Sequence, residues 1–224
     1  MKNIIIPLIL AILIVGGIVF FAVKSDDKQS SAQTVPVSDP IALERETGGA
    51  WVKANANSSV VLAEYSDFQC PACASWKTLI DAVLAKYGQD IRFEYRDYPL
   101  QSIHKRAFAA AKAAEAAGRQ GKFWEMHDLL FANQNIWTES IGFESIIKKY
   151  ATELKLNTDQ FMNDYNSKVV NDIVKSDIEK GDKLGINATP TLYLNNEKIQ
   201  PQSEEDFNKL IEEAIDSSKR KSTD

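Results

Sequence analysis

Two periods of apolar residues alternate along the chain and predict its elements. Residues 60–64 form a run of β-forming apolar side chains, which is typical of a strand covered on both faces. Residues 91–95 alternate apolar with charged side chains, which predicts a second strand. Between these strands the apolar positions recur three and four apart, as in an amphipathic helix that ends at Gly88: Trp76, Leu79, Ile80, Val83 and Leu84.

A long helical region follows before the pattern returns to strands. Helical spacing covers residues 102–117, 122–133, 143–154, 158–165 and 168–184. Residues 191–194 and 198–199 then predict two short strands joined by a turn. An amphipathic helix closes the order, with Ser203 as its cap and Asp206 three residues later, close to a capping box. We therefore predict an α/β fold in which a helical insertion, at about residues 101–185, separates a βαβ unit from a ββα unit.

The amino-terminal segment has a different pattern. Residues 4–23 form an unbroken apolar run of 20 residues between Lys2 and Lys24. As a helix this run is about 30 Å long, the thickness of the hydrocarbon core of a bilayer. A cleaved signal peptide is the alternative, but its apolar core is usually about 7–15 residues long, and no Ala-x-Ala site follows. We expect a single transmembrane anchor at residues 1–24, a polar flexible linker at 25–45 and a short tail at 218–224.

Composition and cysteine usage narrow the class of function. The net charge is −5, and no basic stripe interleaved with aromatic residues is present, which argues against nucleic-acid binding. The chain contains two cysteines, Cys70 and Cys73. A disulfide that closes so short a loop stabilises a fold by only about 2 kcal/mol. The pair is therefore a candidate for chemistry rather than for a structural link.

The two cysteines lie where the first predicted strand gives way to the first predicted helix. If Cys70 caps that helix, Pro71 falls in the first turn, where its missing N–H costs nothing. The free amides and the helix dipole then favour a thiolate at Cys70, while Cys73 lies one turn further in and is more buried. We expect Cys70 to form a mixed disulfide with a partner and Cys73 to resolve it, with Pro71 and Ala72 tuning the reduction potential.

Three segments of the chain resemble DsbA-like thiol:disulfide oxidoreductases, and in particular the membrane-anchored forms of prokaryotic envelopes. They are Glu64-Tyr65-Ser66-Asp67-Phe68-Gln69-Cys70-Pro71-Ala72-Cys73, Lys122-Phe123-Trp124-Glu125-Met126-His127 and Gly185-Ile186-Asn187-Ala188-Thr189-Pro190-Thr191. The resemblance runs from about residue 51 to about residue 217. It implies a thioredoxin-like fold over residues 46–217, with a central mixed β-sheet and an inserted all-helical subdomain.

The resemblance also implies further site residues. Thr189 and Pro190 are expected to share a cis peptide bond beside the cysteines and to bind substrate backbone as an added strand, although only about 5–6% of X–Pro bonds are cis overall. Glu64 is expected to be a half-buried carboxyl that moves the proton of Cys73, with burial raising its pKa. A solvated surface group is the alternative for Glu64. The family often pairs this acid with a lysine on the next strand, where this chain offers instead Arg92, Glu94 and Arg96.

The expected function is oxidation of cysteine pairs in exported proteins by a domain on the outer side of a bacterial or archaeal cell membrane. No cofactor is expected besides a redox-active Cys70–Cys73 disulfide, which a membrane quinone-linked oxidase, DsbB-like or VKOR-like, would restore. The pair Pro71-Ala72 lacks the histidine of the most oxidising family members, so we expect a less extreme oxidant.

Three alternatives stay open beside this interpretation. They are a membrane-anchored reductase or isomerase of the same fold, a non-catalytic thioredoxin-fold binding protein, and a zinc site. The zinc set would be Cys70, Cys73, His104 and His127, but the two histidines are 23 residues apart rather than the three to five of compact sites. We therefore expect no metal.

Overall fold

The computed structural model describes residues 49–221. The predicted anchor at residues 1–24 and the predicted linker at 25–45 lie outside the described residues, as do the last three residues of the predicted tail. Within residues 49–221, no helix combines the length and the apolar character that crossing a membrane would require.

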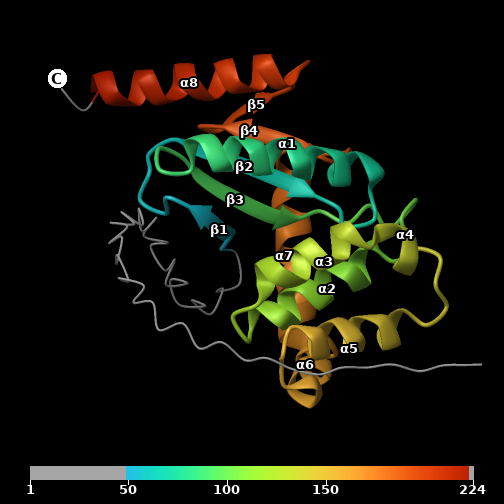
Figure 1. Cartoon of the computed structure of the whole chain (residues 1–224). Coiled ribbons are helices and arrows are strands. Elements are labelled where there is room, and N and C mark those ends of the chain that lie inside the picture. Colours follow the sequence, from blue (N-terminus) through green and yellow to red (C-terminus); the bar gives the residue numbers. More distant parts are fainter. Residues whose placement is uncertain (1–48, 222–224) are drawn as a thin grey trace, which may run out of the picture. The chain divides into compact units, whose positions relative to one another are not determined.

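A five-stranded mixed sheet forms the centre of the fold (Figure 1). β2 runs parallel to β3 and antiparallel to β4, so it is the middle strand of the sheet. The helix between β2 and β3 completes the βαβ unit that the apolar pattern predicts. The sheet order is β1-β3-β2-β4-β5, and the strands are β1 Trp51–Ala54, β2 Val61–Ser66, β3 Arg92–Asp97, β4 Thr191–Leu194 and β5 Glu197–Ile199.

The helices divide into a pair beside the sheet and an inserted group. The first and last helices pack together, with the Trp76 and Phe207 rings 5.6 Å apart. In Figure 1, α2, α3, α5 and α6 gather at the end of the fold away from α8. The helices are α1 Pro71–Tyr87, α2 Ala107–Gly118, α3 Phe123–Ala132, α4 Gln134–Trp137, α5 Phe143–Glu153, α6 Thr158–Tyr165, α7 Lys168–Lys183 and α8 Glu204–Lys221.

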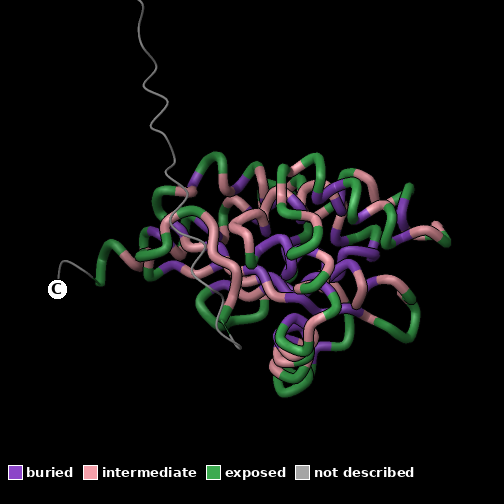
Figure 2. The backbone as a smooth tube through the Cα atoms, turned by 90° about the horizontal axis from the view of Figure 1, so that it is seen from below, coloured by how far each residue is buried: buried purple, intermediate pink, exposed green. Residues whose placement is uncertain are grey.

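One apolar core joins the sheet to the inserted helices. Leu62 and Phe93 from the sheet, Phe123 and Leu130 from α3, and Phe207 from α8 belong to a single buried cluster. The alanine-rich α2 is buried along most of its length, and its small side chains let α3, α6 and α7 pack closely against it. Figure 2 shows the buried positions running through the interior, with exposed positions on the outer faces of the helices. The insertion is therefore part of the same core as the sheet.

The structure corrects the predicted elements in three places. Strand β1 and the short helix α4 were not predicted, because each is only four residues long and too short to show a repeating apolar pattern. The helix predicted from residue 102 begins instead at Ala107. Residues before it form turns, because the Leu100 and Arg106 amides donate to the side chains of Asp67 and Gln69 rather than to a helical ladder. The predicted cap at Ser203 is confirmed, since Ser203 Oγ accepts from the Asp206 amide at 3.1 Å.

Candidate active site

The carboxyl end of β2 delivers both cysteines to the start of α1. Cys70 occupies the cap position of α1 with an extended backbone (φ −75°, ψ 121°), and Pro71 lies in the first turn. No acidic side chain lies in that turn. The amides at the start of α1 lack helical acceptors and carry the positive end of the helix dipole. The local environment of Cys70 therefore favours negative charge.

Cys70 has the properties of a nucleophile. Its exposed fraction is 7%, against 0% for Cys73, and both sulfurs are in the thiol state. A hydrogen bond from the Cys73 side chain, helped by the Cys73 and Ala72 amides and by Thr189, lowers the pKa of Cys70 to about 5 against the opposing effect of burial. A cysteine in a model peptide has a pKa of about 8.5. At neutral pH, Cys70 is therefore a thiolate.

Cys73 has the opposite environment, one turn into the helix. Burial, the hydrogen bond to Cys70 and the nearby Glu64 together raise the pKa of the Cys73 thiol far above its usual range. The Asp67 amide donates to Cys73 Sγ at 3.4 Å. Cys73 therefore keeps its proton while Cys70 is ionised, and it needs a base before it can attack.

The Thr189–Pro190 segment lies directly beside Cys70. Because β4 is antiparallel to β2, with Thr191 opposite Tyr65, the residues just before β4 meet the carboxyl end of β2. The Thr189–Pro190 peptide bond is cis, as the resemblance implies. In its thiol form, Cys70 Sγ donates to the Thr189 carbonyl oxygen at 3.4 Å. In its thiolate form, Cys70 is stabilised by the Thr189 side chain, whose Oγ1 is buried and has no other partner among residues 49–221.

Glu64 is buried beneath the cysteines, and the alternative of a solvated surface group is wrong. Its exposed fraction is 3%, so it is more buried than the half-buried carboxyl that was expected. Burial raises the pKa of Glu64 to about 7, although a hydrogen bond from Ser66 Oγ at 2.8 Å opposes the rise. A carboxyl with a pKa near neutrality can both accept and donate a proton at working pH.

The charged partner of Glu64 does not come from β3. In the parallel register Glu64 lies opposite Tyr95, so the side chains of Arg92, Glu94 and Arg96 point to the other face of the sheet. On that face, Arg92 Nη2 pairs with Glu94 Oε1 at 2.8 Å. The strand-borne lysine that the family often has is therefore not replaced by these residues.

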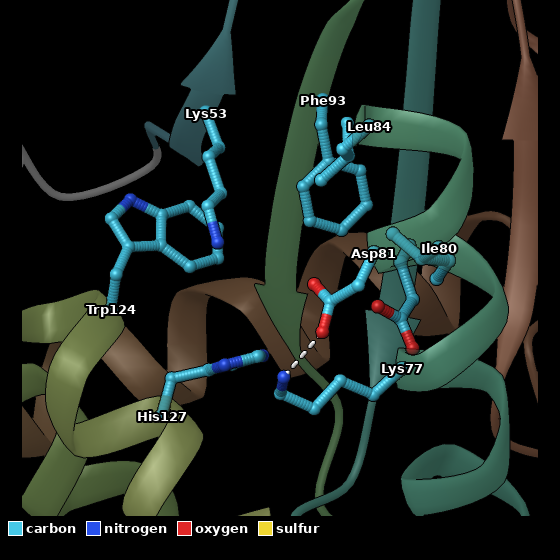
Figure 3. A pocket seen from close by; sticks show the side chains of 9 residues that line it. Lys53, Lys77, Ile80, Asp81, Leu84, Phe93, Trp124 and His127 are labelled. Carbon is cyan, nitrogen blue, oxygen red and sulfur yellow. Dashed lines mark hydrogen bonds and ion pairs between the residues drawn. The ribbon is translucent and has the colours of Figure 1, made fainter. Parts of the chain in front are cut away.

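A small cavity lined by both charged and apolar side chains lies against Glu64 instead. Its volume is about 10 Å³, which is about enough for one water molecule. Figure 3 shows Lys77 and Asp81 projecting into this region from α1, with His127 and Trp124 facing them from α3. Lys77 Nζ lies 2.6 Å from Asp81 Oδ2 and 3.0 Å from Asp128 Oδ1. Lys77, which lies on the redox helix itself, is a cation of this cavity wall whose charge opposes the rise that burial causes in the pKa of Glu64.

Sequence reasoning also missed the residues that hold the loop before Cys70. The buried carboxylate of Asp67 accepts from the Gln69 amide at 2.7 Å, the Leu100 amide at 2.8 Å and His104 Nδ1 at 2.7 Å. Gln134 Nε2 donates to the carbonyls of Phe68 and Cys70 at 2.8 and 3.0 Å. An Asp two residues before an amide that it caps is a turn signal, but the partners from residues 100–134 have no sequence signature.

An apolar groove adjoins Pro190 on the side of α1. It has a volume of about 160 Å³ and is lined by Trp76, Pro190, Leu192, Ile199, Gln200 and Pro201.

The zinc set considered from sequence is not assembled. Within residues 49–221, no three of Cys70, Cys73, His104 and His127 bring ligand atoms close enough to share an ion. The donors at this site are therefore arranged for thiol chemistry rather than for metal binding.

Comparison with known proteins agrees with this geometry. Residues 46–213 match the family model described as thioredoxin. The chain belongs to the thioredoxin family. The matched range includes Glu64, both cysteines and the Thr189–Pro190 segment, so the site lies wholly inside the part of the chain that defines the family.

Solved structures refine the fold of this thioredoxin-family chain. BdbD from Bacillus subtilis superposes with a TM-score of 0.65 at 20% identity, over 76% of this chain and 97% of BdbD. A thioredoxin-like oxidoreductase from Silicibacter pomeroyi DSS-3 gives 0.63 at 23%, over 80% and 96%. Alpha-DsbA1 from Wolbachia pipientis gives 0.64 at 18%, over 76% and 92%. At these identities the likeness establishes the fold, which is the DsbA-like thioredoxin fold that the motifs implied.

The curated relatives are larger proteins, and this chain matches only a part of each. The Na(+)/H(+) antiporter NhaA 1 of Mycolicibacterium gilvum is 38% identical over 152 residues, which are 66% of this chain and 23% of that antiporter. The corresponding protein of Mycolicibacterium vanbaalenii is 38% identical over 149 residues, again 23% of its length. The chain therefore spans about a quarter of these relatives, and the transport in their names is not carried over to it.

Proposed function

We propose that this protein is a thiol:disulfide oxidoreductase that oxidises cysteine pairs in proteins outside the cytoplasm. The observation that carries the proposal is the contrast between the two sulfurs: Cys70 is ionised at the start of α1, and Cys73 is protonated beside Glu64. A thiolate is the attacking and leaving species in disulfide exchange, and a thiol with a low pKa leaves readily. Two cysteines with no such contrast would serve a scaffold equally well, so the contrast favours an enzyme over a non-catalytic binding protein.

The reaction starts from the Cys70–Cys73 disulfide. A client thiolate attacks Cys70 Sγ, a mixed disulfide forms, and Cys73 leaves as a thiolate that takes a proton from Glu64. The second client thiolate then attacks the client sulfur of the mixed disulfide. Cys70 leaves as a stabilised thiolate, the client gains a disulfide, and the enzyme retains the two electrons as a dithiol. In reverse, Glu64 takes the proton of Cys73 as Cys73 attacks.

The proposed client contact is the Thr189–Pro190 segment together with the adjoining groove. An extended client chain pairs with the Thr189 backbone as an added strand, which gives affinity without sequence selection. The apolar wall formed by Trp76, Leu192 and Ile199 accepts an apolar side chain of the client near its cysteine. A cysteine pair within an unfolded exported protein meets both requirements.

The low pKa of Cys70 supports the oxidising direction. Stabilising the thiolate stabilises the dithiol enzyme over the disulfide enzyme, which raises the reduction potential. We place the protein at a prokaryotic cell membrane, anchored by residues 4–23, and assign its reoxidation to a membrane quinone-linked thiol oxidase. A reductase or isomerase is the second candidate, favoured by the Pro71-Ala72 pair, which lacks a histidine that would stabilise the thiolate further.

A reduction potential measured against glutathione separates the two directions. We expect a value above about −180 mV, whereas a value near −270 mV assigns the protein to the reductases. The Cys70→Ser variant should lose all disulfide exchange with a dithiol peptide, and the Cys73→Ser variant, mixed with a peptide that contains a disulfide, should accumulate the mixed disulfide at Cys70 in place of product. Exchange that persists in Cys70→Ser would exclude the proposed function altogether.

A further inference from the structure

The proposed function, on which the following inference rests, leaves one proton without a carrier. Glu64 takes up a proton in each cycle in one direction and gives up a proton in the other. Its side chain is buried, so it can exchange a proton with bulk water only by way of neighbouring groups. The small cavity beside Glu64 is the adjacent space, and its walls belong to α1, to α3 and to strands of the sheet. A group on that wall must exchange protons with both Glu64 and solvent.

His127 lies on that wall and connects it to the surface. Its side chain is only 6% exposed, and its ring packs against Phe68, Tyr95 and Trp124. His127 Nδ1 lies 2.9 Å from Asp128 Oδ1, and the side chain of Asp128 is 49% exposed. Figure 3 shows the ring extending from α3 toward Lys77 and Asp81, across the region that Glu64 also lines. The His127–Asp128 pair thus reaches from the cavity to solvent.

The chemistry of Asp128 fixes the tautomer of His127. Against the opposing effect of partial burial, the hydrogen bond from His127 and the contact with Lys77 lower the pKa of Asp128 to about 2. An ionised carboxylate only accepts hydrogen bonds, so Nδ1 must carry the ring proton. Burial lowers the pKa of His127, which keeps the ring neutral at working pH. Nε2 then has a free lone pair and bonds to no other residue in the range 49–221.

The other charged and titratable groups around the cavity are less suited to this role. Lys77 and Lys53 are ammonium cations, and the first is held by Asp81 and Asp128 while the second lies over the Trp124 ring. Burial raises the pKa of Tyr95 far above the working range, so it remains a neutral phenol. Cys70 and Cys73 are the reacting groups themselves. Asp81 is the remaining rival, because it is partly exposed and lines the same cavity.

We propose that His127 exchanges the proton of Glu64 with solvent across this cavity, with Asp128 as its partner at the surface. When Cys73 attacks, its proton passes to the Glu64 carboxylate. Glu64 then gives a proton to His127 Nε2 through one cavity water, and the imidazolium, stabilised by Asp128, releases the Nδ1 proton to the surface. The neutral ring then returns to the Nδ1–H tautomer, which faces the Asp128 carboxylate. When Cys73 leaves, the same steps run in reverse. No electron is transferred, and one proton moves per cycle. His127 acts through Glu64 and is a positioning residue for its proton.

The test measures two steps separately in the full-length protein: formation of the mixed disulfide at Cys70 and its resolution by Cys73. Dithiol enzyme is mixed with oxidised glutathione in a rapid-quench instrument, and mixed disulfide and oxidised enzyme are quantified by mass after acid trapping. Mixed-disulfide formation uses Cys70 alone, so the His127→Gln variant should match the wild type in that step. In the same variant the rate of resolution by Cys73 should fall about tenfold. This is part of the roughly 10²–10⁴-fold in rate that a positioned proton-transfer group contributes. The wild-type pH profile of resolution should also flatten near neutrality in His127→Gln.

Matched variants identify the route. Asp128→Asn should slow resolution less than His127→Gln does, because the imidazolium loses its counter-charge but the relay remains. In a Glu64→Gln background, His127→Gln should have no further effect. If Asp81→Asn abolishes the pH dependence of resolution and His127→Gln leaves it unchanged, the route runs through Asp81 and the proposal is overturned. If the wild type itself forms no mixed disulfide with glutathione, the proposed function fails instead.

A measurement on the wild-type protein tests the proposal independently of whether the variants fold correctly. Nitrogen-15 spectra of the His127 ring should report a proton on Nδ1 and a bare Nε2 in the dithiol state at neutral pH. A proton on Nε2 would overturn the proposal, because that nitrogen could then not accept from the cavity.

Discussion

Two buried acids only three positions apart, Glu64 and Asp67, occupy contrasting surroundings. Asp67 lies in the loop at the mouth of α1, where two backbone amides and a histidine converge on its carboxylate. Glu64 lies in the middle strand beside the cavity, where it receives one hydrogen bond, from Ser66, and the pKa of Glu64 rises to about 7. Convergent donors favour a fixed charge, whereas burial with few donors favours a group that titrates.

The two sides of the redox site, the start of α1 around Cys70 and the cavity beside Glu64, therefore have different roles. On the mouth side, at the start of α1, the Cys73 side chain stabilises the Cys70 thiolate most, and the backbone amides and the Thr189 side chain add donors that carry no charge of their own. On the cavity side, Glu64 controls when Cys73 can ionise, and its state depends on pH. Changes on the mouth side should therefore shift properties by a constant amount, and changes on the cavity side should act only in a pH window.

The largest effect is expected from Glu64→Gln on stability. The folded carboxyl keeps its proton up to about pH 7, while the unfolded carboxyl loses it near 4.5, so wild-type stability falls as pH rises through this interval. Gln keeps the acceptor for Ser66 and does not titrate. Urea unfolding of the dithiol protein should show equal pH trends below about pH 4 and a gain of about 3 kcal/mol in Glu64→Gln by pH 8.

The control for that measurement is Glu197→Gln, on the exposed β5. It should change stability by less than about 0.5 kcal/mol at every pH. Cys70 titrates in the wild type and in the Glu64→Gln variant alike, so its contribution cancels in the difference between the two proteins. A Glu64→Gln difference that stays constant with pH would mean that Glu64 does not titrate in the folded protein.

The sequence predicted the parts of this site that local rules determine. Cys70 as a cap, Pro71 in the first turn and a strand leading into them follow from spacing alone. The burial of Glu64 was implied by the resemblance, although its depth was underestimated. The cis bond at Thr189–Pro190 came from the resemblance and not from any rule of composition.

The parts that were missed depend on contacts distant in sequence. The sequence singled out His104 and His127 only as members of the zinc set, yet the structure places His104 against Asp67 and His127 on the cavity wall. A partner for Glu64 was sought on the next strand, because strand neighbours are the contacts that register predicts. Lys77 instead approaches from α1, and only the packing of a helix across the sheet brings it there. Such contacts can be identified only once the tertiary structure is known.

The second prediction tests the mouth side with Asp67→Asn. The amide can accept at its oxygen but presents an NH₂ group to donors that need an acceptor, so at least one buried N–H loses its partner. We expect a loss of about 2 kcal/mol that does not turn into a gain as the pH rises through 7. Urea unfolding measures it, and Asp216→Asn on the exposed face of α8 is the matched control. A loss that varied with pH as Glu64→Gln does would erase the distinction between the two acids.

The smallest effect is expected from Thr189→Val, which keeps the shape of the side chain and its carbonyl but removes the hydroxyl beside Cys70. The thiolate loses one donor while the Cys73 side chain and the first-turn amides remain, so the pKa of Cys70 should rise from about 5 by roughly 0.5–1. Ultraviolet absorbance of the thiolate against pH measures the shift, with Thr152→Val on exposed α5 as the control. Because the hydroxyl is a fixed donor, the reduction potential should fall as the pKa of Cys70 rises, and the pH profile of Cys73 resolution should stay unchanged. If that profile moved together with the pKa of Cys70, the mouth and the cavity would be a single coupled system rather than two.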